Sequence, residues 1–174
     1  MLAHRRLHEF MSTVCCSDSP NAAEAHSEDY CQGNGASPKF NDAKATDVRR
    51  VMCEREISTA LCPPGWTYYK DAGSEGKDSC LYVSASTLSN WNTASTSCSP
   101  GSHLLTVVSS GTTGGILPFA TALFSSGVFV GCSQSSTATQ RAMGWSWVDG
   151  TSANNLNCGA GGNGCGIWNT GEPK

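Results

Sequence analysis

The stretch from Cys62 to Val107 constrains the fold of this chain more than any other part of the sequence. Cysteines, tryptophans and short apolar strings follow one another there in a distinctive order: Cys62-Pro-Pro-Gly-Trp66, Ser79-Cys80-Leu81-Tyr82, Trp91-x-x-Ala94-x-x-x-Cys98 and His103-Leu104-Leu105-Thr106-Val107. Such a pattern is typical of a small fold in which short strands and a helix are stapled by disulfides.

Local patterns in this stretch predict a hairpin followed by a helix. Aromatic and β-branched residues predict strands at 66–69 and 81–83. Apolar and small residues then recur three and four positions apart over 91–98, which predicts a helix with Cys98 facing inward beside Trp91. Asn90 or Ser89 can cap that helix.

The remaining elements that the sequence predicts are short. They are a weaker helix over 111–126 and strands at 128–130 and 145–147. Pro118 fits the first turn of that helix. Residues 133–143 are polar and predict a loop. Residues 151–166 are rich in Asn and Gly, and we expect Cys158 and Cys165 to staple this irregular loop.

Composition limits the class of protein. Ten cysteines without a C-x-x-C pair favour disulfides over structural zinc, and therefore an oxidising compartment. A net charge of −3 gives no electrostatic reason to bind nucleic acid. No segment is apolar enough to cross a membrane, and no apolar run follows Arg5-Arg6 as in a signal peptide.

Motifs of common enzyme classes are absent from the sequence. There is no G-x-S-x-G, no H-E-x-x-H and no phosphate-binding G-x-x-x-x-G-K-[ST]. His103 is expected at the edge of the core, and Asp149-Gly150 is expected to form a turn. The sequence therefore predicts a protein that is not an enzyme.

The order of motifs after Cys62 resembles the opening part of a C-type lectin-like domain. Phe129-Val130-Gly131, Trp145-Ser146-Trp147-Val148-Asp149-Gly150 and Trp168-x-x-Gly171-Glu172-Pro173 stand where that family has its W-I-G-L strand, W-x-W-x-D-G turn and E-P-N tripeptide. The resemblance implies an α+β fold with two helices, small antiparallel sheets and a long irregular loop, with residues 58–174 as the N-terminal part of one domain.

Residues 18–57 resemble the closing part of the same family. The matching strings are Glu28-Asp29-Tyr30-Cys31, Phe40-Asn41-Asp42 and Arg50-Val51-Met52-Cys53-Glu54, with Ser19-Pro20-Asn21 near the place of E-P-N. Residues 1–17 carry no motif and are expected to be disordered. Two interpretations follow. The chain is a fragment of a tandem-domain protein, or its two parts pair as one circularly permuted domain.

The resemblance also implies disulfide pairs. Cys62–Cys80 would close the N-terminal hairpin, and Cys53–Cys98 would form if the two parts pair. Cys31 loses its family partner, because Ala45 stands in that position. Cys132 is expected to be a small buried apolar residue. Cys15 and Cys16 have no assigned partner.

Calcium is the cofactor that the resemblance implies. Its ligands would be oxygen atoms of Glu172, Asn41, Asp42, Asp29 and Glu28, with Glu172, Asn41 and Asn21 also contacting a sugar. Lys174 and Ser19 each replace a ligand of the family's tripeptide, and a lysine offers no acceptor oxygen.

The expected function is non-enzymatic binding of carbohydrate or glycoprotein by an extracellular protein or ectodomain, with calcium assistance. The alternative is a calcium-independent lectin-like module for protein interaction or adhesion.

Overall fold

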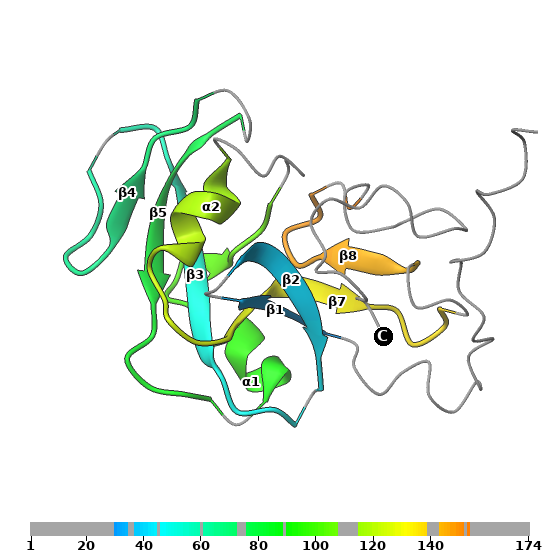
Figure 1. Ribbon diagram of the computed structural model, residues 1–174. Coiled ribbons are helices and arrows are strands. Elements are labelled where there is room, and N and C mark those ends of the chain that lie inside the picture. The colour runs from blue at the N-terminus through cyan, green and yellow to red at the C-terminus, as the bar shows by residue number, and fades with distance from the viewer. Residues whose placement is uncertain are drawn as a thin grey trace, which may run out of the picture.

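The computed structural model describes residues 30–34, 37–44, 46–59, 61–72, 76–88, 90–107, 115–138, 143–151 and 153. Over these residues the chain forms eight strands and two helices (Figure 1): β1 (Tyr30–Asn34), β2 (Ser37–Ala43), β3 (Arg50–Ile57), β4 (Thr67–Tyr69), β5 (Asp78–Val83), α1 (Trp91–Ser95), β6 (His103–Leu104), α2 (Ile116–Thr121), β7 (Val128–Gln134) and β8 (Trp145–Trp147).

All the described strands belong to one mixed sheet. Its order is β2-β1-β7-β3-β5-β4, with β6 also paired to β3 and β8 to β7. The pairs are antiparallel except for β3 and β7, which run parallel where Val51 pairs with Phe129. β7 therefore lies between β1 and β3, so a strand from later in the chain separates two strands of residues 30–57 (Figure 1).

Both faces of the sheet are covered. Successive side chains of a strand point to opposite sides, so a single strand contributes to the core clusters on both faces. Met52, Val128 and Val130 pack into a core cluster that includes the apolar side of α2. Val51, Cys53 and Phe129, at the alternate positions, pack into a second cluster with Trp91 and Ala94 of α1. The two short helices thus close opposite faces of the sheet.

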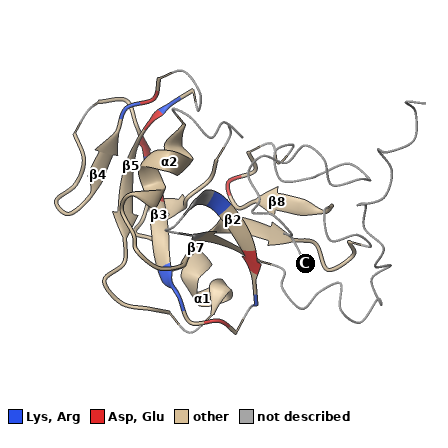
Figure 2. Ribbon diagram, viewed as in Figure 1, with Lys and Arg blue, Asp and Glu red and all other residues tan. Residues whose placement is uncertain are grey.

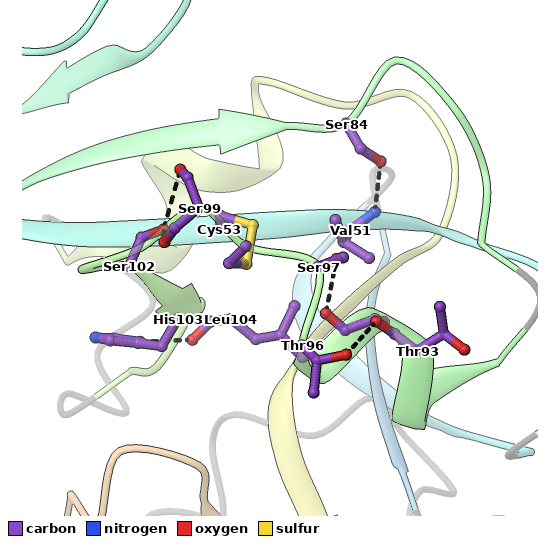
Figure 3. Close-up of a disulfide and its surroundings, with 12 residues drawn as sticks. Val51, Cys53, Ser84, Thr93, Thr96, Ser97, Ser99, Ser102, His103 and Leu104 are labelled. Atoms are coloured by element: carbon purple, nitrogen blue, oxygen red, sulfur yellow. Dashed lines mark hydrogen bonds between the residues drawn. A yellow bond between two sulfur atoms is a disulfide. The ribbon is translucent and has the colours of Figure 1, made fainter.

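Helix α1 begins as the sequence predicts and ends early. Asn90 caps it, its side-chain oxygen accepting a hydrogen bond from the Thr93 N–H at 2.7 Å. The hydroxyls of Thr96 and Ser97 donate to carbonyls three residues earlier, which competes with further helical turns (Figure 3). The helix therefore stops at Ser95, and Cys98 lies beyond it.

Other elements differ from prediction mainly in length. Pro118 lies in the first turn of α2, as expected, but the helix covers only six residues. β7 extends to Gln134 although the polar sequence from Ser133 predicts a loop. The reason is pairing on both sides, because Ser133 lies opposite Tyr30 of β1 and Ser146 of β8.

Three disulfides join described residues. Two are the pairs named from the sequence, Cys62–Cys80 and Cys53–Cys98. The third joins Cys31 to Cys132, with the two Cα atoms 5.4 Å apart. The predictions that Cys31 lacks a partner and that Cys132 is only an apolar side chain are therefore wrong. Cys15, Cys16, Cys158 and Cys165 lie outside the described residues.

Charge is sparse over the described part of the chain. Charged ribbon segments of both signs are scattered among uncharged ones (Figure 2). No helix in this part of the chain is long and apolar enough to cross a membrane.

Candidate functional site

A buried carboxylate lies at the centre of the main polar site. β3 places Glu54 opposite Leu81 of β5, and its side chain is fully buried. The Ser79 hydroxyl donates to Oε1 at 2.6 Å, and the Thr106 N–H donates to Oε2 at 3.1 Å. Both carboxylate oxygens are thus satisfied, as a buried charge requires.

Asp149, in the turn after β8, extends this network. The Thr106 hydroxyl donates to its Oδ2 at 3.0 Å, and Thr151 donates through both its N–H and its hydroxyl. Burial by itself raises the pKa of Asp149. The hydrogen bonds from Thr151 and Thr106, together with nearby His103, outweigh burial and hold the pKa below its usual value.

Lys77 supplies the positive charge of the site. Its Nζ lies 2.5 Å from the Glu56 carboxylate, 3.9 Å from Glu54 and 4.0 Å from Asp149. Burial by itself lowers the pKa of Lys77. The hydrogen bond to Glu56 and the charges of Glu54, Glu56 and Asp149 outweigh burial and raise the pKa above its ordinary value.

We call these residues the polar cluster, made of Glu54, Glu56, Lys77, Ser79, His103, Thr106 and Asp149. Within it, ligand atoms of Glu56, His103 and Asp149 lie within 4.8 Å of one another, a set of donors that a divalent cation could use. The Lys77 ammonium pairs with Glu56 and also lies near Asp149. Charge pairs and hydrogen bonds of the polar cluster thus link β3, β5, the residues after β6 and the turn after β8.

Sequence reasoning did not predict this cluster. Its charged members are spread from residue 54 to residue 149. They come together through the pairing of β3 with β5, β6 and β7 and of β7 with β8. His103 is half-buried, as expected for the core edge. Asp149 does form a turn, with Gly150 at a φ of +79°, but it also binds Thr106, which no local pattern indicates.

The predicted calcium ligands fall into two groups. Asn41 and Asp42 lie on β2, where the alternation of side chains places them on opposite faces of the strand. Asp42 is buried, with 6% of its surface exposed, and Asn41 is half-buried. The other predicted residues lie outside the described part of the chain: Glu28, Asp29, Asn21 and Glu172.

Three of the tryptophans in the described part of the chain belong to the core. Trp91, Trp145 and Trp147 are buried. Trp66 is half-buried instead. Its ring contacts Tyr82, at 5.4 Å between ring centroids, and the Arg55 guanidinium lies 5.6 Å from the ring centroid.

Comparison with known proteins gives no relatives. No protein-family model, no curated protein and no solved structure matches this chain.

Proposed function

We propose that this chain is an extracellular, non-enzymatic binding module with a C-type lectin-like fold in circularly permuted order, and that its ligand is carbohydrate or glycoprotein. In this arrangement residues 18–57 supply the closing part of the domain and residues 58–174 supply its opening part.

The observation that carries the proposal is the Cys53–Cys98 disulfide, which joins β3 to the segment after α1. The motif order implies this pair only if the two parts of the chain form one domain. The Cα atoms of the two cysteines are 5.7 Å apart across a sequence separation of 45 residues. The Ser97 hydroxyl donates to the Ala94 carbonyl, and the Ser99 and Ser102 hydroxyls bond each other in the segment that follows α1 (Figure 3).

The disulfides also bear on the cellular compartment in which the protein folds. Three disulfides within the described residues are typical of proteins that fold under oxidising conditions. This supports an extracellular protein or the ectodomain of a membrane protein.

A half-buried amide on β2 supports a calcium-assisted site. Asn41 lies on the opposite face of the strand from the buried Asp42 and keeps partial exposure to solvent. Carboxylate and amide oxygens are the ligands that calcium prefers, and the bound ion would contact sugar hydroxyls.

A calcium-independent protein ligand is the second candidate, favoured by the position of Asp42. Its side chain lies on the same face of β2 as the buried Phe40, and its cross-strand neighbour is the disulfide-bonded Cys31. A ligand oxygen there is turned toward the core. Lys174, which replaces the asparagine of the family's tripeptide and offers no acceptor oxygen, also favours the calcium-independent candidate.

Calorimetric titration of Ca²⁺ into the oxidised protein, followed by a glycan array with and without a chelator, tests the two candidates. Asn41→Ala is the test variant and Asn92→Ala, an exposed residue of α1, is its matched control. A measurable heat of Ca²⁺ binding, together with glycan binding that the chelator abolishes, would support the first candidate. Asn41→Ala should weaken both signals, and Asn92→Ala should leave them unchanged. Protein binding without either signal would select the second, and a silent glycan array would overturn carbohydrate as the ligand.

A further inference from the structure

The polar cluster holds more negative than positive charge. The carboxylates of Glu54, Glu56 and Asp149 all lie within 4.0 Å of the Lys77 ammonium. One positive charge thus faces three negative charges, which leaves a net charge of −2 in the cluster when His103 is neutral. Opposite charges attract at this range even near a protein surface. Further positive charge at this place would therefore be stabilised.

His103 is oriented as histidines in metal sites are. Its Nδ1 lies 2.8 Å from the Leu104 carbonyl oxygen (Figure 3). A carbonyl can only accept a hydrogen bond, so a neutral ring carries its proton on Nδ1 and its lone pair on Nε2. Histidines that bind a metal typically donate their other ring N–H to a carbonyl or carboxylate, which fixes the tautomer and the orientation of the ring.

Asp149 is also held in a fixed orientation. The hydroxyls of Thr106 and Thr151 donate to its Oδ2, and the Thr151 N–H donates to its Oδ1. Only 12% of the Asp149 side chain is exposed. An ionised carboxylate has about four lone-pair sites, so these three hydrogen bonds still allow it to bind a cation.

Glu56 supplies the third ligand, from β3. Its side chain is 55% exposed and lies on the same face of the strand as that of Glu54. The ligand atoms of Glu56, His103 and Asp149 lie within 4.8 Å of one another. Ligand atoms around a tetrahedral Zn²⁺ at about 2 Å are roughly 3–4 Å apart. A small rotation of the exposed Glu56 side chain would therefore bring the three groups to binding distance.

We propose that Glu56, His103 and Asp149 form a zinc site, in which Zn²⁺ takes the place of the Lys77 ammonium beside Glu56. Water supplies the remaining position of the four-coordinate ion. The imidazole favours a transition metal over Ca²⁺, which prefers oxygen ligands. After the exchange Lys77 keeps Glu54 as a partner, 3.9 Å from its Nζ. The site shares no residue with the proposed calcium site and does not depend on which ligand the module binds.

Calorimetric titration of Zn²⁺ into the full oxidised chain tests this site, and a parallel titration of Ca²⁺ measures selectivity. His103→Gln should weaken Zn²⁺ binding at least about tenfold, because loss of a group that merely orients a metal ligand typically costs that much. Glu56→Gln should weaken it as well. Asp47→Asn is the matched control, because it also removes a carboxylate from a surface ion pair, with Arg49 at 3.0 Å, and should leave Zn²⁺ binding unchanged.

Lys77→Gln tests the exchange itself. Removing the competing ammonium should tighten Zn²⁺ binding by about fivefold. Thermal unfolding without metal checks that each variant is folded. Asn41→Ala should leave Zn²⁺ binding unchanged, so failure of the zinc site and failure of the calcium site can be told apart.

Three results would overturn the proposal. The first is no heat of Zn²⁺ binding to the unmodified chain. The second is Zn²⁺ binding that His103→Gln and Glu56→Gln leave unchanged, which would assign the metal to other groups. The third is binding to Lys77→Gln that is no tighter than binding to the unmodified chain.

Discussion

Glu54 and Thr106 are joined by two hydrogen bonds, from the Thr106 N–H at 3.1 Å and from its hydroxyl at 3.3 Å, although 52 residues separate them in sequence. The same hydroxyl reaches Asp149. A buried carboxylate on a central strand thus holds Thr106, and through the Thr106 hydroxyl the turn after β8.

Replacing Glu54 by Leu should destabilise the protein by about 2–4 kcal/mol. The Ser79 hydroxyl and the Thr106 N–H would remain buried without an acceptor, and Lys77 would lose one of its carboxylates. Urea unfolding followed by tryptophan fluorescence measures the change. Glu56→Gln is the control, because its ion pair with Lys77 is exposed and should be worth at most about 1 kcal/mol. Equal losses for the two variants would contradict a central role for Glu54.

Acid should weaken the fold partly through Asp149. Its pKa is lowered in the folded protein, so its contribution to stability is fully present above the unfolded value of about 3.9. The contribution is lost as the pH falls through the lower folded pKa. Urea unfolding between neutral pH and strong acid should therefore show a steeper decline for the unmodified protein than for Asp149→Asn. Parallel curves would show that Asp149 plays no part in this pH dependence.

Removing the Cys53–Cys98 disulfide should cost more stability than removing Cys62–Cys80. Loop-closure entropy gives about 4 kcal/mol for a separation of 45 residues and about 3 kcal/mol for 18. Paired Cys→Ala variants compared by thermal unfolding test the order. The reverse order would mean that native-state packing around the two bonds, rather than chain entropy, dominates their effects.

Gly131→Ala should destabilise the protein by about 1–3 kcal/mol, the range for overpacked sites. A Cβ there would lie 2.8 Å from the Leu104 carbonyl oxygen and 3.0 Å from that of Leu105, and these backbone atoms cannot move aside cheaply. Gly127→Ala is the matched control, because its nearest neighbours are side-chain atoms of Gln32 and Arg49 rather than backbone. Thermal unfolding should separate the two variants clearly. A loss at Gly127 as large as that at Gly131 would contradict the steric account.

The sequence predicted those features that depend on neighbours along the chain or on the order of motifs. Asn90 as the cap of α1 is a local pattern, and Cys53–Cys98 follows from motif order. The partner of Cys132 was missed, because it depends on β7 pairing with β1 across a separation of 101 residues.

The polar cluster was missed for a related reason. Lys77 meets Glu54 and Asp149 only after strands far apart in the sequence have paired. No spacing in the sequence marks these three residues as neighbours. The order of strands in the sheet brings them into contact, and no single segment of the sequence does so.

The position of β7 between β1 and β3 sets the timing of folding during synthesis. Cys31 leaves the ribosome 101 residues ahead of its partner Cys132. At about 5–20 residues per second, that interval is roughly 5–20 s. During this interval β2 is the only sheet neighbour available to β1 among the described strands. The Cys31 thiol is then free beside an unpaired strand edge. Successful production of this protein therefore requires conditions that allow incorrect disulfides to rearrange until β7 arrives.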